Sequence, residues 1–510
     1  MWNRNNPVCR LPLVVCCWLL IASCAVGPDF ERPKPPAVTQ YTQGKEPTET
    51  VTAAGQSQRF ESGAKIAADW WQLFQSPKLD VVIKEAINQN PSLQSAQARL
   101  RQSQDNLRAG YGVFFPQASG GFAYTRERFT PSQFGSTAQP TLFNLFTAQA
   151  AVSYVLDVFG GQRRTVESLA AQVDYQNYTA LATYLTLLGN VSNTAIAQAA
   201  YLAQIEATEQ LITFQKEQLR ITETQFKAGT VPYANVVSLQ AQLAATEATL
   251  PPLRQNLNKS QHLLAALVGR TPAEWASPPL ELTDFTLPLD LPVTLPSELV
   301  QQRPDILAAE ATLHSACANI GVATAAMFPS FTLSAGYGQS AIDITKLFGT
   351  GANFWSAGAA MVQPLFRGGT LWYQRKAAIE AYQASQSDYR QAVLSAFQQV
   401  ADTLRAVEHD AETLKAQSEA LAAAEQALKL IQANYQSGLA NYLQVLTADN
   451  QYQQAMLGYI QAKALRLQDT AALFVALGGG WWQSTANLAA KEVKTETPSA
   501  AAALSANPKN

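Results

Sequence analysis

The sequence is poor in the residues that most enzymes use for catalysis. Its 510 residues include only three histidines, and none of them stands in a metal-ligand spacing or beside a nucleophile motif: His262, His314 and His409. The Gly-x-Ser-x-Gly, P-loop and His-Glu-x-x-His patterns are absent. Each histidine is therefore interpreted as an ordinary helix residue, and the sequence predicts neither an enzyme nor a metal site.

Charged residues are scarce as well, at 15% of the chain, and 36 basic residues nearly balance 38 acidic ones. A clustered excess of basic residues is the electrostatic footprint of nucleic-acid binding. The balance found here therefore gives no argument for a nucleic-acid partner.

The N-terminus lacks an apolar run long enough to cross a membrane. The run Leu11–Ile21 is shorter than the ~20 apolar residues that span a bilayer. With two arginines before it and small residues after it, the run fits a secretory signal peptide over residues 1–23. Ile21-Ala-Ser-Cys24 resembles a bacterial lipobox, which implies cleavage before Cys24 and acylation of that residue. An ordinary signal with a chance cysteine is the alternative. Ala25 is not the Asp that retains lipoproteins in the inner membrane, so the outer membrane is expected.

The predicted mature chain also lacks a pair of free cysteines that could form a disulfide. Of five cysteines, three lie in the predicted signal peptide, and Cys24 is the expected acylation site. Cys317 remains alone, on an apolar helical stretch, so no intramolecular disulfide is expected. We interpret Cys317 as a small core residue.

What the chain does contain is one long pattern that occurs twice. Pairs 213 positions apart match in type, including Pro91 with Pro304, Asn106 with Asn319, Phe115-Pro116 with Phe328-Pro329, and Tyr124 with Tyr337. Later pairs drift by a few residues, among them Phe159 with Phe366. A constant offset over many positions indicates internal duplication. We expect a first repeat at 69–269, a linker rich in proline at 270–296 and a second repeat at 297–480.

Each repeat is predicted to contain the same five parts. A helix ends at Phe-Pro, because Pro lacks a backbone donor and disfavours helix before it. Two strands, a very long helix, a Gly turn and a return helix follow. The expected elements lie at about 77–112, 116–127, 146–158, 162–227 and 232–267, and again at about 297–327, 330–340, 353–365, 370–436 and 442–476. We expect an extended strap at 24–68 and a disordered tail at 481–510.

The strands are predicted from alternation. In the second repeat, apolar side chains alternate with small or polar ones over 331–338, and the same holds over 147–158 in the first. One apolar face suits a transmembrane β-barrel, and equally a soluble sheet with one buried face. Four strands cannot close a barrel, and an open edge cannot lie in lipid. If these strands cross a membrane, the chain must oligomerise. Bacterial barrels begin near eight strands, so the smallest symmetric assemblies are a dimer and a trimer.

The long helices carry a seven-residue repeat of mostly apolar residues, which predicts a coiled-coil seam: Val191, Gln198, Ile205, Ile212, Leu219 and Phe226. At 1.5 Å per residue, each long helix would reach ~100 Å. Rods of this length attached to a barrel suggest a conduit that crosses the periplasm.

Both long helices end at a glycine, Gly229 in the first repeat and Gly438 in the second. Glycine is the usual residue just past a helix end because it adopts positive φ without a Cβ clash. Each long helix and its return helix are therefore predicted to form a hairpin with the glycine at its tip.

The ordered set of these features resembles the outer membrane factor family of TolC-like channels, in its lipidated OprM/NodT-type efflux branch. The residues that carry the resemblance are Cys24-Ala-Val-Gly-Pro28, Arg303-Pro-Asp-Ile306, the two Phe-Pro junctions and the two Gly tips. The resemblance covers about residues 24–480. It implies an α+β membrane protein that forms a homotrimer, with four strands per chain closing a twelve-stranded barrel above an α-helical coiled-coil tunnel.

The same resemblance implies a passive exit duct for drugs or other small molecules, with no cofactor and no catalysis. Its expected partners are a periplasmic adaptor (membrane fusion protein), which docks at the tips around Gly229 and Gly438, an inner-membrane efflux transporter, and outer-membrane lipid. Two alternatives stay open: the exit duct of a protein-secretion system, and a structural periplasmic coiled-coil lipoprotein.

In this family the tips also hold the gate. Members carry an acidic residue nine positions after the second tip glycine, where this chain has Thr447, and TolC-like relatives have Asp at the position of Gln444. Tyr435 keeps the family's aromatic residue, and Asn235 stands at the partner position of the first repeat. The resemblance therefore predicts an uncharged latch of hydrogen bonds among these four residues. Asp449 is interpreted as a solvated or interhelical carboxylate.

Overall fold

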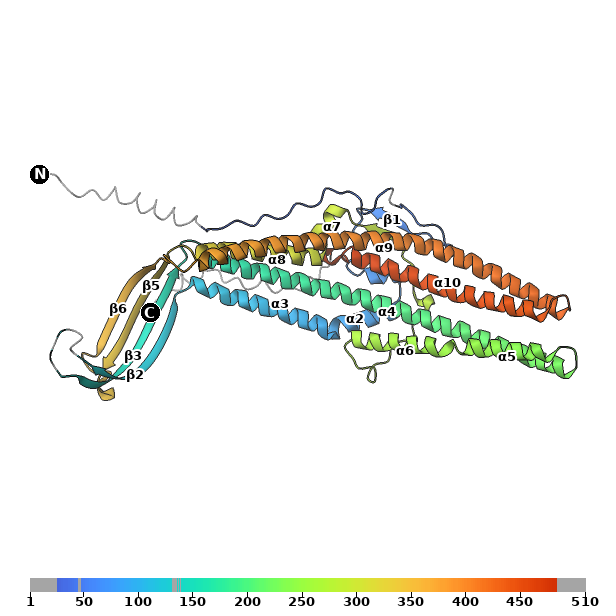
Figure 1. The fold of residues 1–510 in the computed structure, drawn as a ribbon, viewed down its shortest axis with the longest axis horizontal. Helices are drawn as coiled ribbons and strands as arrows, with labels where there is room; N and C mark the ends of the chain where they lie inside the picture. Colours follow the sequence, from blue (N-terminus) through green and yellow to red (C-terminus); the bar gives the residue numbers. More distant parts are fainter. Residues whose placement is uncertain (1–24, 45–46, 131–134, 136, 138, 484–510) are drawn as a thin grey trace, which may run out of the picture. The chain divides into compact units, whose positions relative to one another are not determined.

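The computed structural model describes residues 25–44, 47–130, 135, 137 and 139–483 (Figure 1). The predicted signal peptide, Cys24 and the predicted tail beyond Gln483 lie outside the described residues. The chain divides into two compact units, and each unit takes residues from both halves of the duplication. Unit 1 contains the chain up to Pro33, Leu100–Gln176 and Ala309–Tyr389, and unit 2 contains Lys34–Arg99, Asn177–Ala308 and the chain from Arg390 onward.

Unit 1 is built on a four-stranded antiparallel sheet in the order β2-β3-β5-β6 (Figure 1). Its strands are β2 (Gln117–Phe129), β3 (Thr141–Leu156), β5 (Ser330–Ala341) and β6 (Asn353–Val362). The 3-10 turns η3 (Tyr111–Phe114) and η6 (Ile344–Lys346) also belong to this unit. All four strands lie where alternation predicted them, with ends that differ by a few residues.

The register places most of the apolar side chains of the four strands on one face of the sheet. Tyr124 is opposite Phe146, Phe146 is opposite Ala341, and Tyr337 is opposite Trp355. Since side chains alternate along a strand, the face of Tyr124 also holds Phe122, Val152, Tyr154, Leu333 and Met361, together with Arg126 and Arg128 toward the end of β2. The other face carries mainly small and polar residues and a smaller number of apolar ones: Thr125, Thr147, Gln149, Ser153, Ser334, Gly336, Ser340 and Ser356, with Phe143, Leu145 and Phe354 among the apolar exceptions. One face of the sheet is therefore largely apolar, and the other is largely small and polar.

Nine helices of seven residues or more occupy the described residues. They are α2 (Pro77–Gln89), α3 (Pro91–Gly110), α4 (Gly161–Lys227), α5 (Tyr233–Glu247), α6 (Leu250–Leu267), α7 (Pro296–Gln302), α8 (Pro304–Ala325), α9 (Thr370–Gln436) and α10 (Tyr442–Ala476). α4 and α9 have 67 residues each. α8 is the one described helix long and apolar enough to cross a membrane, but 56% of its apolar window is buried, as in a core helix.

Three predicted helices are each divided in two by proline. The helix expected over 77–112 stops at Asn90, whose ψ of 120° is extended, and restarts at Pro91. The second repeat breaks in the same way at Arg303, with ψ of 122°, before Pro304. The residue before a proline is pushed out of the helical region, which explains both breaks. The first return helix divides between α5 and α6, just before Pro251.

Unit 2 joins the N-terminal strap to the linker. β1 (Arg59–Ser62) pairs in parallel with β4 (Asp290–Val293), and the turn η5 (Leu282–Asp284) lies in the same linker. The strap is therefore extended over β1, and the linker between the repeats contains the strand that pairs with it.

The core of unit 2 forms where η2 (Trp70–Phe74) meets α10. Trp70 stacks on Phe474 with ring centroids 5.5 Å apart, and both residues are fully buried. The predicted coiled-coil seam of α4 is buried from Val191 to Ile212, whereas Phe226 at the tip is 42% exposed. A short 3-10 helix, η7 (Trp481–Gln483), occupies the start of the segment that was expected to be disordered.

Candidate functional site at the helical tips and the N-terminal anchor

The two hairpin tips have the same backbone geometry. Gly229 has φ of 75° and Gly438 has φ of 79°, both in the left-handed region. Past α4, the amide of Thr230 donates to Gln225 O at 3.0 Å, and past α9 the amide of Leu439 donates to Asn434 O at 2.7 Å. These bonds satisfy the last carbonyls of each helix in the Schellman manner. The geometry explains the requirement for glycine at both predicted tips.

Aromatic residues bracket each tip. The ring centroid of Phe226, at the end of α4, lies 5.3 Å from that of Tyr233. The ring centroid of Tyr435, at the end of α9, lies 6.1 Å from that of Tyr442. Tyr435, predicted to belong to the gate, also donates from its hydroxyl to Gln225 Oε1 at 3.2 Å. This bond links the end of α9 to the end of α4, so it ties one hairpin to the other.

Gln444 and Thr447, two further predicted gate residues, bond within their own helix. Gln444 and Asn441 form a reciprocal capping box at the start of α10, with the two backbone-to-side-chain distances at 3.0 and 2.9 Å. Thr447 Oγ1 donates to Leu443 O at 2.9 Å. The fourth predicted residue, Asn235, is half-buried in the first turn of α5. Among the described residues of one chain, these four side chains are not joined into one network, and the latch stays a prediction.

Two further polar contacts between the hairpins lie farther from the tips, where the sequence analysis did not place them. Gln215 on α4 donates to Asp449 Oδ2 on α10 at 2.7 Å, and Gln242 on α5 donates to Asn450 Oδ1. Asp449 is 4% exposed, and burial raises the pKa of its carboxyl group above the ordinary value. Asp449 is therefore an interhelical group rather than a solvated one, which was one of its two predicted roles.

Large apolar side chains are exposed around the second tip. Leu439 is 81% exposed and Leu443 is 67% exposed. Tyr233, at the first tip, is 59% exposed. The sequence analysis singled out the glycines and missed the two leucines. Their signal was available, because each is a large apolar residue within a few positions of a hairpin turn.

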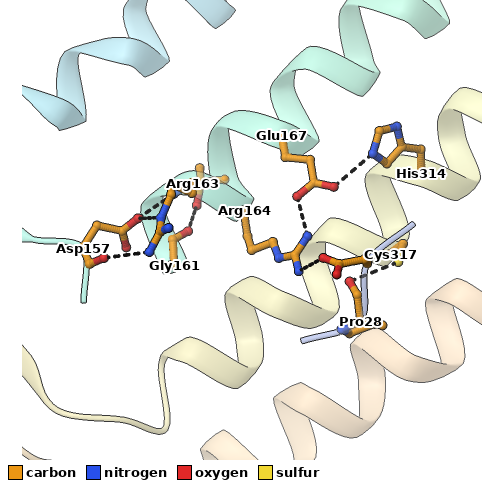
Figure 2. Close-up of polar contacts among 10 residues, drawn as sticks. Pro28, Asp157, Gly161, Arg163, Arg164, Glu167, His314 and Cys317 are labelled. Carbon is orange, nitrogen blue, oxygen red and sulfur yellow. Dashed lines mark hydrogen bonds and ion pairs between the residues drawn. The ribbon is translucent and has the colours of Figure 1, made fainter. Parts of the chain in front are cut away.

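In unit 1, the start of α4 holds the segment that follows Cys24 (Figure 2). Asp157 caps α4, because its carboxylate accepts from the backbone amides of Gln162 at 2.9 Å and Arg163 at 3.0 Å. The next residue, Arg164, is 5% exposed. It donates to Asp29 Oδ1 at 2.6 Å and to Glu167 Oε2 at 2.7 Å.

α8 completes this N-terminal anchor. His314 bonds to Glu167 at 3.0 Å (Figure 2). The ring of His314 also stacks on Phe30, with ring centroids 4.3 Å apart. The buried thiol of Cys317 donates to Pro28 O at 3.7 Å. A Cβ at Gly27 would lie 2.5 Å from Gly321 Cα, so the backbones approach closely there. His314 and Cys317 thus hold the strap, a role that the sequence analysis did not assign to either.

The anchor leads back to the end of β3. Val26 N donates to Phe159 O at 3.0 Å, three residues beyond the last residue of that strand. The chain that follows Cys24 is therefore fixed where β3 gives way to α4. No cluster of three or more metal-ligating side chains occurs among the described residues.

Comparisons with known proteins agree with this arrangement. The chain belongs to the family described as Outer membrane efflux protein, which matches residues 82–270 and 295–479. The two matched ranges correspond to the two repeats. The family confirms the resemblance to outer membrane factors, and it makes the chain an outer-membrane component of an efflux system.

Individual relatives cover most of the chain. The pyoverdine export outer membrane protein OpmQ of Pseudomonas aeruginosa is 29% identical over 455 residues, which is 87% of this chain and 94% of that protein. The probable efflux pump outer membrane protein TtgC of Pseudomonas putida is 28% identical over 94% of this chain and 97% of its own. The solved structure of the outer-membrane channel OprN matches with a TM-score of 0.81 and 26% identity, over 90% of this chain and 100% of that one.

Proposed function

We propose that three copies of this chain form the exit duct of a tripartite efflux pump. The observation that carries the proposal is the four-stranded sheet, which has one apolar face and ends in two edge strands, β2 and β6. Three such sheets supply twelve strands, more than the eight at which bacterial barrels begin. Closing them into one barrel pairs every edge, as hydrocarbon requires. The apolar face would then meet lipid, and the small and polar face would line the pore.

The helices supply the periplasmic part of the duct. α4 and α9, with 67 residues each, are long enough to reach ~100 Å. Grouped around a threefold axis, three sets of these hairpins would surround a tunnel that continues the barrel. The duct is passive, and energy comes from an inner-membrane transporter. We further propose that its cargo consists of drugs or other small molecules, as the functions of its relatives suggest.

The tips are the proposed docking sites for a periplasmic adaptor. Gly229 and Gly438 shape the turns, and Leu439 and Leu443 offer exposed apolar surface beside the second one. The gate is proposed to lie at the same end and to be uncharged, with Tyr435 as its aromatic member. The hydroxyl of Tyr435 already spans the two hairpins of one copy.

The test combines single-channel conductance in a planar bilayer with the mass of the same detergent-purified sample. A trimer that conducts steadily is the expected result. A monomeric species that does not conduct and stays soluble without detergent after removal of its lipid would overturn the proposal and favour a periplasmic coiled-coil lipoprotein.

A second experiment separates efflux from protein secretion. The chain is expressed in a strain that lacks its own copy, and the export of toxic small molecules is compared with the proteins found in the medium. Restored drug tolerance with an unchanged set of secreted proteins is expected. Restored protein export without restored tolerance would identify a secretion duct instead.

A further inference from the structure

The two edge strands of the sheet in unit 1 need a partner. Within the part of the chain that the structure describes, β2 and β6 each bond to one neighbouring strand, so the outer side of each carries backbone donors and acceptors that face away from the sheet. Such groups cannot lie unpaired in hydrocarbon. Their partner must therefore be another strand, and its register is the question.

The duplication extends to the register of the sheet. In the first repeat Tyr124 lies opposite Phe146, and in the second Tyr337 lies opposite Trp355. At the other end of the same two ladders, Gln117 lies opposite Ser153 and Ser330 lies opposite Val362. β2 therefore maps onto β5 with an offset of 213 positions, and β3 maps onto β6 with an offset of 209. Both offsets hold along the whole of each ladder.

The centre of the sheet shows how one repeat pairs with the next. β3 of the first repeat pairs with β5 of the second, with Ala150 opposite Tyr337 and Val152 opposite Ala335. The two offsets give the equivalent residues on the two edge strands. Adding 209 to Ala150 gives Ala359 on β6, and subtracting 213 from Tyr337 gives Tyr124 on β2. Ala359 and Tyr124 are therefore the edge-strand equivalents of the Ala150–Tyr337 pair.

We propose that β6 of one copy pairs antiparallel with β2 of a second copy in the register that sets Ala359 opposite Tyr124. The proposal rests on the proposed trimeric duct and adds the register and the contact residues of its seam.

The side chains that this register brings together suit one another. Met361 comes opposite Phe122 of the second copy, and a thioether sulfur packs favourably against an aromatic ring. Trp355 comes opposite Arg128, which permits a cation–π contact. Trp355, Met361 and Phe122 are all more than 60% exposed in one copy. These pairs also keep the apolar face continuous across the seam.

Other registers fail one of these conditions. A slip of one residue would move the whole apolar set of one strand to the pore face. A slip of two residues would keep the faces, but it would depart from the register in which β3 pairs with β5 at the centre of the sheet. The equivalence of the two ladders therefore selects the register with Ala359 opposite Tyr124.

Thiol cross-linking tests the register. In a Cys317→Ala background, Tyr124→Cys is combined in turn with Ala359→Cys, Ala357→Cys and Met361→Cys, and each purified protein is treated with a short bifunctional thiol reagent. All three positions of β6 lie on the face of Tyr124, so only the register differs among them. Covalent dimers and trimers on a denaturing gel are expected to be most abundant for the Ala359→Cys pair.

The outcomes separate the seam from the oligomer. A higher yield from either slipped pair, equal yields from all three, or no product from a sample whose mass is trimeric would overturn the register and leave the proposed duct standing. A sample whose mass is monomeric, with no product from any pair, would overturn the proposed function itself.

Discussion

Arg303 is a buried cation that joins three helical segments of unit 2. Its guanidinium donates to Ala476 O, the last residue of α10, at 2.8 Å, and to Ala396 O on α9 at 3.3 Å. It also pairs with Asp305 at 2.9 Å. The last carbonyls of a helix have no partner within it, so Arg303 satisfies a group that would otherwise be buried without a donor. The helix break at Pro304 places the side chain where it reaches both helices.

Replacing Arg303 by Met should destabilise unit 2 by about 2 kcal/mol or more, because buried acceptors lose charged donors. Arg303→Lys should recover only part of the loss, since an ammonium group cannot reproduce the planar fork. Thermal unfolding of the detergent-purified protein, followed by circular dichroism, measures both. Arg99→Met, at an exposed arginine on α3, is the control and should change little. A Met variant as stable as the wild type would show that the helix end does not need this donor.

Asp449 should make the protein less stable near neutral pH than at mildly acidic pH. Burial raises the pKa of its carboxyl group, and its Oδ1 is buried without a hydrogen-bond partner. A carboxyl group whose folded-state pKa is raised binds more protons folded than unfolded, so its contribution to stability falls as pH rises above the unfolded value of 3.8. Asp449→Asn should therefore raise the melting temperature at pH 7 and lose that advantage as the pH falls toward 4.

The control for this experiment is Glu206→Gln, which removes an exposed carboxylate from α4. Its melting temperature should follow the wild type at every pH. If Asp449→Asn also followed the wild type, the buried carboxyl would not be titrating in the folded protein.

Residue-scale roles were the hardest to predict from the sequence. The family pattern located Tyr435 and the tip glycines, because turn geometry and aromatic identity are visible in one chain. It did not reveal that Gln215 would meet Asp449, since this contact depends on how α4 and α10 are aligned 234 positions apart. Nor could it show that Gln444 is held in a capping box by Asn441, although the Asn-x-x-Gln spacing at 441–444 is a known signal for one.

At the scale of helix pairs, α9 and α10 are joined by two carboxyl groups. Asp410 on α9 faces Asp469 on α10, and a hydrogen bond between these two carboxyl groups can form only when one of them carries a proton. Burial, followed by this bond and the charge of Asp469, raises the pKa of Asp410 to about 7. Arg466 lies near enough to oppose the shift, and its own pKa is lowered by burial.

The pairing of α9 with α10 should therefore weaken as the pH rises from about 4 to about 7. Within that window the folded protein holds a proton that the unfolded chain has lost, so stability declines with pH. Asp410→Asn keeps the hydrogen bond without the proton and should flatten the decline of melting temperature between pH 5 and pH 8. Asp402→Asn, at an exposed position on α9, should leave the decline unchanged. An unaltered slope in Asp410→Asn would exclude a shared proton at this pair.

The tips test the link between element geometry and function. Gly438→Val forces a β-branched residue into the left-handed region and should cost about 1–2 kcal/mol locally. Gly438→Asn is the matched control, because Asn tolerates that conformation better than other residues do. A Cβ at Gly438 meets nothing within 4 Å, so the two variants differ in backbone strain rather than in crowding. In a strain that lacks its own channel, drug tolerance should fall for the Gly438→Val variant and be kept by the Gly438→Asn variant. Equal tolerance for the two variants would show that adaptor docking does not depend on the geometry of this tip.

Element existence followed from the sequence more readily than element boundaries. The alternation over 331–338 and the seven-residue repeat along α4 depend on burial of one face, which is a property of the local pattern. The breaks at Asn90 and Arg303 were missed even though Pro follows each. Proline is common in the first turn of a helix, so its presence did not by itself argue against one continuous helix. The helices α2 and α3, and likewise α7 and α8, are separated only by the extended backbone of the residue that precedes the proline.

At the scale of the whole chain, the duplication carried most of the predicted architecture. One offset of 213 positions fixed which segments are equivalent, and the two ranges matched by the efflux family coincide with the repeats. The two compact units were not visible in the sequence. Each unit collects pieces of both repeats, because pairing of β3 with β5 and the mixing of helices from both halves bring equivalent segments together.

The last prediction concerns how the chain is attached to its membrane. Cys24→Ser should abolish incorporation of radioactive palmitate. The protein should still reach the outer membrane as a trimer, because the apolar face of its strands does not depend on the lipid. The segment just after Cys24 is held by Arg164 and by Phe159 O, so the acyl group would attach where β3 gives way to α4.

The control is Cys317→Ser, which changes a buried cysteine and should leave the labelling intact. Labelling that persisted in Cys24→Ser would refute the lipobox. Loss of both the label and the trimer would instead mean that the lipid is needed for assembly. In that case the contacts of Arg164 and His314 would serve to hold the acyl chain in position while the barrel closes.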